Sequence, residues 1–244
     1  MAQLVIDIGN TLIKIAVFNG AELVSVHHYN TVGYQTLQAL LVKYAINKAI
    51  VSTVRNGKES WLSELEHQLS VIYFDRNMAY GIYNHYRTPQ TLGADRLAAV
   101  IGARHLFPGE DNLVIDAGTC ITYDGIDAGG NYYGGSISPG LVMRYKALQQ
   151  YTAVLPLVDA DATFDKSYGD DTLTAIRSGV QNGIKYEAEG FIRSYSQANK
   201  PLNIILTGGD SVFLDTVLKN SIFAGYIKTE PHLVLKGLNV AIKA

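Results

Sequence analysis

Cysteine and long apolar runs are scarce in this chain. The 244 residues include a single cysteine, so an intramolecular disulfide framework is excluded. The longest apolar run, 97–103, contains a glycine and is far shorter than the roughly 18 residues of a membrane-spanning helix. The first residues carry Asp7 and no basic stretch, which favours a cytoplasmic protein over a secreted one. We expect no membrane association.

An excess of basic charge is also missing. Twenty Lys and Arg face 22 Asp and Glu, for a net charge of -2, and this balance disfavours binding to nucleic acid through a general positive field. Apolar residues make up 48% of the chain and charged residues 17%, which is typical of a folded protein. A chain of this length forms one or two domains.

The sequence contains an internal repeat. Residues 4–9 (LVIDIG) recur as LVIDAG at 113–118, and each copy continues into a threonine and a second strand-like stretch. The first copy passes through Asn19-Gly20, a strong hairpin signal, into a return strand at 22–29. The second copy is expected to turn at Asp124-Gly125 and again at 129–130. The pattern predicts a duplicated α/β fold of two β-meanders, with an active cleft between the halves.

Apolar residues at helical spacing predict helices between these strands. Helices are expected at 37–44, 61–69, 95–106 and 211–218, with short strands at 48–53 and 202–206. The longest apolar stripe runs from Leu173 through Ile176, Val180 and Ile184 to Phe191. Gly179 and Gly183 lie one turn apart on its flank, where another backbone could come close. This helix could serve the core of one chain or a seam between two subunits.

Both repeats offer chemistry that suits a phosphate. The turn Gly9-Asn10-Thr11 supplies N–H groups, an amide and a hydroxyl, and Asp7 can face a phosphate-bound cation. One such turn is an ordinary strand terminator, but two equivalent copies favour a shared polyphosphate site. A third turn, Thr207-Gly208-Gly209-Asp210, opens a helix, and its glycines let a base or ribose approach the backbone.

Together these motifs resemble those of the acetate and sugar kinase, heat-shock chaperone and actin superfamily. The segments 7–11 and 116–119 are similar to its two phosphate motifs, and 207–210 is similar to its adenosine motif. Gly93-Ala94-Asp95-Arg96 and the segment 134–140 (GGSISPG) further resemble type III pantothenate kinase. This resemblance implies duplicated actin-like, ribonuclease H-like halves at 1–110 and 111–244, with an ATP cleft between them.

The resemblance also implies a role for individual residues. The expected ATP-binding residues are Asp7, Ile8, Gly9, Asn10, Thr11, Leu12, Ile13, Lys14, Thr119, Gly208 and Gly209. The expected substrate-binding residues are Tyr86, Gly93, Ala94, Asp95, Arg96 and Thr172. Asp95 is implied as the general base, and Asp116 as the ligand of potassium or ammonium. Without the resemblance, Asp95-Arg96 would be a charged first helical turn and Asp171-Thr172 an ordinary helix cap.

The implied reaction is ATP-dependent phosphorylation of pantothenate to 4'-phosphopantothenate, the first step of coenzyme A biosynthesis, by a homodimer with magnesium. The resemblance favours the apolar stripe that begins at Leu173 as the seam of this dimer. The residues suit this chemistry, because phosphoryl transfer needs positioned groups and neutralised charge. Two alternatives remain: another small-molecule kinase of the superfamily with a different acceptor pocket, and a nucleotide-binding regulator without turnover.

Overall fold

The computed structural model describes residues 2–55, 59–78, 80–196 and 200–243, which form two compact units. The first unit joins the chain up to Leu106 to the segment from Leu233 onward, and the second comprises residues 107–232. The sequence-based division after residue 110 assigned the C-terminal segment to the second half, whereas here it belongs to the first unit. Among the described residues, no helix combines the length and apolar character that crossing a membrane requires.

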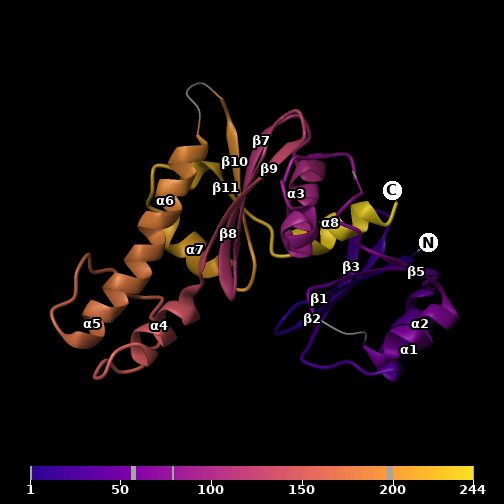
Figure 1. Ribbon diagram of the computed structural model, residues 1–244, viewed down its shortest axis with the longest axis horizontal. Helices are drawn as coiled ribbons and strands as arrows, with labels where there is room; N and C mark the ends of the chain where they lie inside the picture. Colours follow the sequence, from indigo (N-terminus) through magenta and orange to yellow (C-terminus); the bar gives the residue numbers. More distant parts are fainter. Residues whose placement is uncertain (1, 56–58, 79, 197–199, 244) are drawn as a thin grey trace. The chain divides into compact units, whose positions relative to one another are not determined.

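The first unit contains a five-stranded mixed sheet with the order β3-β2-β1-β4-β5 (Figure 1). Its strands are β1 (Ala2–Ile8), β2 (Ile13–Asn19), β3 (Glu22–Tyr29), β4 (Lys48–Thr53) and β5 (Ser70–Tyr73). β1 to β3 form the predicted antiparallel meander, and β4 runs parallel to β1. The helices α1 (Tyr34–Tyr44) and α2 (Ser60–Gln68) bury Leu37 and Trp61 in the same apolar core as the strands.

The C-terminal helix α8 (Leu233–Ala241) packs against α3 (Ala94–Leu106) within the first unit. A Cβ atom on Gly102 would lie 2.6 Å from the Leu233 carbonyl oxygen, and one on Gly237 would overlap the Ala98 carbonyl. The two helices therefore touch backbone to backbone, which only glycine allows at these positions. This contact explains why the C-terminal segment joins the first unit.

The second unit repeats the topology of the first. Its strands are β7 (Asp111–Ala117), β8 (Cys120–Ile126), β9 (Asn131–Pro139), β10 (Leu202–Thr207) and β11 (Ile227–Thr229). They follow the order β9-β8-β7-β10-β11, with an antiparallel meander and two parallel additions, as in the first sheet. The predicted duplication is therefore confirmed.

One predicted turn of this second meander is wrong. Asp124-Gly125 lies inside β8, and the chain turns instead between Asp127 and Asn131. Gly130, with φ +86°, closes this turn by donating its N–H to the Asp127 carbonyl at 2.9 Å. The positive φ of this turn favours glycine at position 130. Asp124 is buried inside β8.

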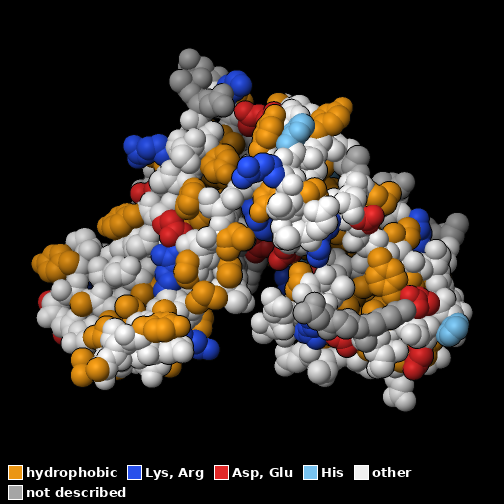
Figure 2. Space-filling view, viewed as in Figure 1, with side chains coloured by type: hydrophobic (Ala, Val, Ile, Leu, Met, Phe, Trp, Pro, Cys, Tyr) orange, Lys and Arg blue, Asp and Glu red, His pale blue; other side chains and the backbone are white. Residues whose placement is uncertain are grey.

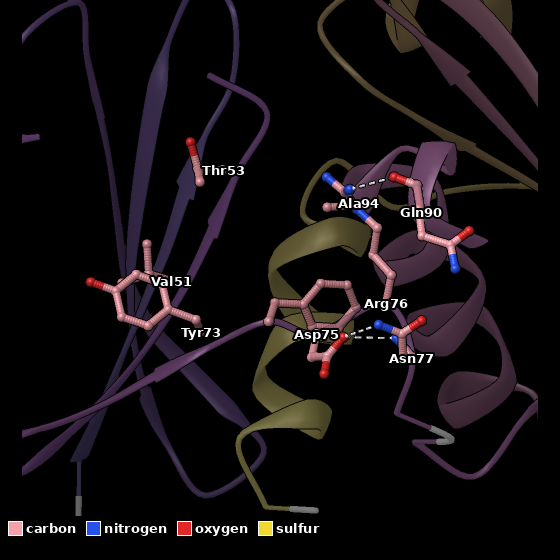
Figure 3. A pocket seen from close by; sticks show the side chains of 9 residues that line it. Val51, Thr53, Tyr73, Asp75, Arg76, Asn77, Gln90 and Ala94 are labelled. Atoms are coloured by element: carbon pink, nitrogen blue, oxygen red, sulfur yellow. Dashed lines mark hydrogen bonds between the residues drawn. The ribbon is translucent and has the colours of Figure 1, made fainter. Parts of the chain in front are cut away.

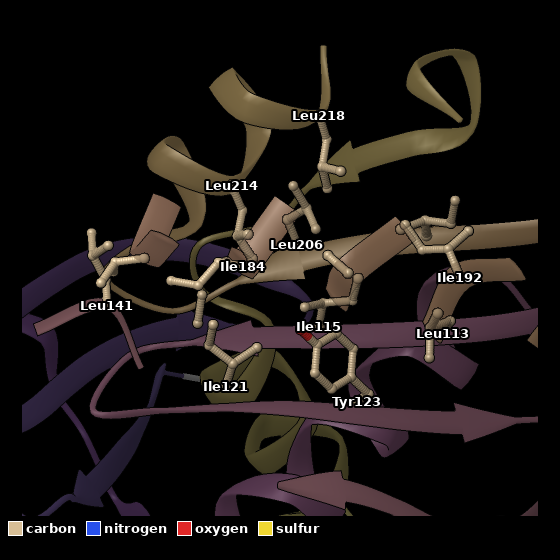
Figure 4. Close-up of a cluster of buried hydrophobic side chains, with 14 of the residues drawn as sticks. Leu113, Ile115, Ile121, Tyr123, Leu141, Ile184, Ile192, Leu206, Leu214 and Leu218 are labelled. Atoms are coloured by element: carbon tan, nitrogen blue, oxygen red, sulfur yellow. The ribbon is translucent and has the colours of Figure 1, made fainter. Parts of the chain in front are cut away.

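The second unit also holds α4 (Leu141–Gln150), α5 (Thr172–Arg177), α6 (Gly183–Tyr195) and α7 (Ser211–Leu218). One π-helical turn, Ser178–Asn182, joins α5 to α6. Ile176, Val180 and Ile184 are buried in one core with strand residues. Figure 4 shows Ile184 among them, beside strand residues such as Ile115. The centre of the apolar stripe, from Ile176 to Ile184, is therefore internal to this unit and not a subunit seam.

The ends and flank of the predicted stripe differ from its centre. Leu173 is 47% exposed at the start of α5. A Cβ atom on Gly179 or Gly183 would have no described heavy atom of another element within 4 Å. These two glycines therefore serve no close contact within the described part of the chain.

Candidate active site

The turn after β1 presents backbone N–H groups beside a lysine. The N–H of Gly9 donates to the Leu12 carbonyl at 3.0 Å and closes the turn, so that Asn10 and Thr11 are exposed at its tip. In the antiparallel register of β1 and β2, Lys14 pairs with Asp7. The turn thus combines N–H donors, a hydroxyl and a cation, which are the groups that bind a phosphate.

Asp7 is a buried carboxylate at the end of β1. Its side chain is only 6% exposed, and burial raises its pKa from 3.8 to about 6. The Lys14 ammonium lowers this pKa and the Asp95 carboxylate raises it. The Asp95 carboxylate therefore acts on the ionisation of Asp7 within the first unit. A carboxylate in this state gains stability when a cation approaches it.

The four residues Gly93 to Arg96 form the start of α3. The Gly93 carbonyl accepts the N–H of Leu97 at 3.2 Å, and Asp95 Oδ1 accepts the N–H of Arg96 at 2.8 Å. A Cβ atom on Gly93 would lie 2.5 Å from Asp95 Oδ1, so glycine here makes room for the carboxylate. The Arg96 guanidinium is buried 5.8 Å from the Tyr86 ring centroid. The first unit thus brings together Tyr86 and the expected substrate motif.

In the second unit, the end of β7 meets the turn after β10. The N–H of Asp210 donates to the Ala117 carbonyl at 2.9 Å. Gly208 has φ +89°, and a Cβ atom there would overlap Asp116 Oδ1 and the Ala117 carbonyl oxygen. The second phosphate motif and the adenosine motif therefore form one surface, with Gly209 exposed beside them.

The oxygen atoms around Gly208 suit a hard cation. Carboxylate and carbonyl oxygens are the usual ligands of such ions, and Asp116 Oδ1 and the Ala117 carbonyl both approach this glycine. The described residues contain no group of three or more His, Cys, Asp or Glu side chains that could hold a metal. A cation here would therefore need ligands from a bound nucleotide or water as well as from Asp116.

Some expected contact residues can reach a ligand only through their backbone. Ile8 and Ile13 are buried in the core of the first unit, and the Leu12 carbonyl accepts the Gly9 N–H.

Two other expected contact residues expose their side chains. Thr119 is exposed in the turn between β7 and β8. Thr172 is exposed at the first position of α5, after a capping box formed by Asp171 and Thr174.

Sequence reasoning missed a pocket of about 650 Å³ in the first unit (Figure 3). Its lining residues are Val51, Thr53, Tyr73, Phe74, Asp75, Arg76, Asn77, Gln90 and Ala94. Arg76 Nη1 donates to the Gln90 carbonyl at 3.0 Å. Asp75 Oδ1 accepts hydrogen bonds from the backbone N–H and the side-chain Nδ2 of Asn77. The segment 74–77 carries no motif, so no sequence signal placed it beside the start of α3.

Known proteins resemble this chain over its whole length. Residues 3–194 match the type III pantothenate kinase family. The type III pantothenate kinase of Bacteroides fragilis strain YCH46 is 47% identical over 238 residues, which cover 97% of this chain and 96% of that protein.

Two solved structures share the fold at low sequence identity. A conserved Baf family protein from Campylobacter jejuni aligns with a TM-score of 0.62 and 24% identity, covering 98% of this chain and 97% of that one. The activator of the 2-hydroxyisocaproyl-CoA dehydratase from Clostridium difficile aligns with a TM-score of 0.57 and 12% identity, covering 100% and 94%. The fold is thus the actin-like α/β fold expected from the sequence. With its motifs, its fold and its relatives in agreement, the chain belongs to the type III pantothenate kinase family, which catalyses the first step of coenzyme A biosynthesis.

Proposed function

We propose that this chain transfers the γ-phosphoryl group of ATP to the primary hydroxyl of pantothenate, with Asp95 as the general base. Asp95 accepts the hydroxyl proton as the new O–P bond forms, and the bond from the γ-phosphorus to the bridging oxygen breaks to release ADP. The observation that carries this proposal is the match of residues 3–194 to the type III pantothenate kinase family. The first phosphate motif and the substrate motif both belong to the first unit.

The remaining ATP contacts follow from the exposed groups of the two motifs. In the first unit, the N–H groups of the turn after Gly9 and the Lys14 ammonium are the proposed phosphate contacts. In the second unit, the proposed nucleotide-binding groups are Thr119 and the Gly208-Gly209 turn. The activator from Clostridium difficile, which shares this fold, was solved with bound ADPNP. That observation supports the proposal that this fold binds a nucleotide.

Two cations have suitable ligands in the chain. Asp7, whose pKa burial raises to about 6, would hold magnesium on the ATP phosphates. Asp116, with the Ala117 carbonyl beside it, would hold potassium or ammonium. When bound, these ions neutralise phosphate charge. The chain's own part is to keep both carboxylates fixed at the ends of two rigid strands.

The acceptor is assigned to the first unit. The pocket of about 650 Å³ includes Ala94, the neighbour of Asp95, and its volume lies in the usual range for small-molecule sites. Val51 and Phe74 provide apolar walls, and Arg76 provides a cation. This combination suits pantothenate, which has a branched gem-dimethyl group and a carboxylate. Tyr86 and Arg96 form the second part of the acceptor site in the first unit. The substrate role of Thr172 stays a prediction from the family resemblance.

We also propose that the working form is a homodimer. Exposed apolar side chains gather over α4 and α5 and the segment between them (Figure 2). The exposed side chains there are Val142, Met143, Tyr151, Val154, Leu157 and Leu173. Several exposed apolar side chains on neighbouring elements are typical of a protein interface. Because Thr172 adjoins Leu173, association and substrate binding would be linked.

A coupled assay of ADP release tests the reaction. Purified protein should release ADP only when pantothenate is present, and faster in potassium or ammonium than in sodium at equal ionic strength. A panel of other small alcohols, including sugars, separates pantothenate from the acceptors of related kinases. ADP release that does not depend on pantothenate, or nucleotide binding without turnover, would contradict the proposal.

A further inference from the structure

Arg55 lies beside the first phosphate turn because of the register of β4. In the parallel pairing of β1 with β4, Ile8 is opposite Thr53. The chain continues along β1 for one more residue, since the N–H of Val54 donates to the Ile8 carbonyl at 3.1 Å. The next residue, Arg55, then falls next to Gly9. Its own N–H donates to Thr53 Oγ1 at 3.1 Å, which bends the chain at this point.

The Arg55 guanidinium is fixed at two edges. Its Nε donates to the Gly9 carbonyl at 2.8 Å, and its Nη1 donates to Glu59 Oε1 at 3.2 Å. The guanidinium group is planar and rigid, so two bonds on different nitrogens define its orientation. The Arg55 side chain is 28% exposed and Glu59 is 30% exposed. Arg55 thus ties the phosphate turn to the beginning of α2.

The bond to Gly9 determines the direction of the next N–H group. In a trans peptide unit, the carbonyl and the following N–H point in opposite directions, and the described residues include no cis peptide bond. When Arg55 holds the Gly9 carbonyl on its own side, the Asn10 N–H must point to the other side. This N–H makes no hydrogen bond to another described residue. It is therefore available to a ligand.

We propose that Arg55 is a positioning residue of the kinase reaction, which orients the Gly9–Asn10 peptide so that the Asn10 N–H donates to an ATP phosphate oxygen. This inference rests on the proposed function, because it assumes that the turn binds ATP. Arg55 need not touch the nucleotide. Its contribution comes from a peptide that is already oriented before ATP arrives, so less ordering is needed on binding.

Steady-state kinetics of Arg55→Ala, Arg55→Lys and Glu59→Gln test this role. A hydrogen bond from a charged group contributes enough that Arg55→Ala should raise the KM for ATP roughly 10-fold or more, with the KM for pantothenate unchanged. Arg55→Lys can donate to Gly9 but lacks the second fixed edge, so its KM for ATP should fall between those of the wild type and Arg55→Ala. Glu59→Gln keeps the Gly9 bond and should remain close to the wild type.

Arg87→Ala is the matched control for loss of a positive charge, because Arg87 is exposed in the same unit and does not line the pocket. It should leave both KM values unchanged. An unchanged KM for ATP in Arg55→Ala, or an equal rise for pantothenate, would overturn the inference. If Arg55→Ala fails to fold, a KM for ATP in Arg55→Lys equal to that of the wild type would overturn it instead.

A second readout separates positioning from a merely structural role. The Asn10 amide resonance of the wild type should shift on titration with magnesium and ADP, and this shift should be reduced in Arg55→Lys. An equal shift at equal saturation in the variant would overturn the inference. The titration also distinguishes the two proposals. A wild type that binds ADP through Asn10 but shows no pantothenate-dependent turnover would contradict the proposed function and leave the role of Arg55 in place.

Discussion

Two carboxylates of the first unit, Asp7 and Asp95, sit in different surroundings. Asp7 is enclosed at the end of a central strand, where burial disfavours its charge, and Asp95 is half-buried in the first turn of α3. A buried carboxylate with a raised pKa is well suited to meet an arriving cation. A half-buried one at a helix start can meet a substrate hydroxyl. The environments thus support separate roles for two residues of the same type.

Asp95→Asn tests the general base. The amide keeps the shape of the side chain but cannot accept a proton in the same way, so kcat should fall about 100-fold or more. Binding of ATP, measured by calorimetry, should persist because the turn after β1 is unchanged. A variant with the wild-type kcat would show that another group accepts the proton.

Asp7→Asn tests the cost of burying a charge. The folded carboxyl has a pKa of about 6 against 3.8 without burial, so the folded state binds the proton more tightly than the unfolded state. Ionisation therefore destabilises the fold progressively as the pH rises from about 4 to about 6, and fully above that range. The shift corresponds to at most about 3 kcal/mol.

Urea unfolding should accordingly show Asp7→Asn to be more stable than the wild type at pH 8 and nearly equal to it at pH 4. The activity of the variant should be lost at both pH values, because the cation ligand is gone. Equal stability of the two proteins at pH 8 would contradict a dominant effect of burial.

At the scale of elements, α3 and α8 pack closely within the first unit. Gly102 and Gly237 bring the two backbones together, and α3 begins with the substrate motif Gly93 to Arg96. The position of Asp95 thus depends on a helix from the far end of the chain. A substitution that separates α3 from α8 should therefore also displace the substrate motif.

Gly237→Ala should destabilise the protein, because its Cβ would overlap the Ala98 carbonyl. Overpacking of this kind costs about 1 to 3 kcal/mol, and thermal unfolding should show a lower Tm. Gly190→Ala is the matched control, since Gly190 lies in α6 with no other described element within 4 Å of its Cβ. That variant should gain about 0.5 to 1 kcal/mol from helix propensity. Equal Tm values for the two variants would contradict the close packing.

Local patterns predicted most of the elements well, because strands rich in β-branched residues and amphipathic helices carry their own signals. The strand at 48–53 and the helix at 211–218 agree with β4 and α7. Helix α8 was not predicted, since it is apolar nearly all round and its partner α3 is distant in sequence. Gly179 and Gly183 make no close contact in the described chain. A glycine pair permits another backbone to come close but does not show that one does.

The site was predictable to the extent that it lies in repeated turns. The repeat led to Asp7 and Asp116, while the roles of Asp95 and Thr172 came from the resemblance. Arg55 and Arg76 carry no motif, and only strand register and loop folding bring them to the turn and the pocket. Such residues follow from tertiary structure, so a single sequence gives no signal for them.

At the scale of the whole molecule, Val154→Asp tests the homodimer. Val154 is 87% exposed in the segment after α4, so the charge should not disturb the fold. If a second copy covers this surface, the buried aspartate would be unpaired and dimerisation should weaken strongly. Light scattering should then show a monomer. Val42→Asp is the control, because Val42 is 79% exposed on α1 in the first unit. A Val154→Asp protein with the same mass as this control would contradict the proposed interface.

The return of α8 to the first unit has a consequence for how the protein is made. The ribosome adds α8 only after all of residues 107–232 have been synthesised. The second unit is continuous in sequence and can fold as soon as it leaves the ribosome. Until α8 is made, the face of α3 that packs against α8 stays uncovered. The start of α3 carries the substrate motif, so the acceptor site should be the last part to mature. A chain stalled before Leu233 should therefore hold a folded second unit and a substrate motif that is not yet locked in place.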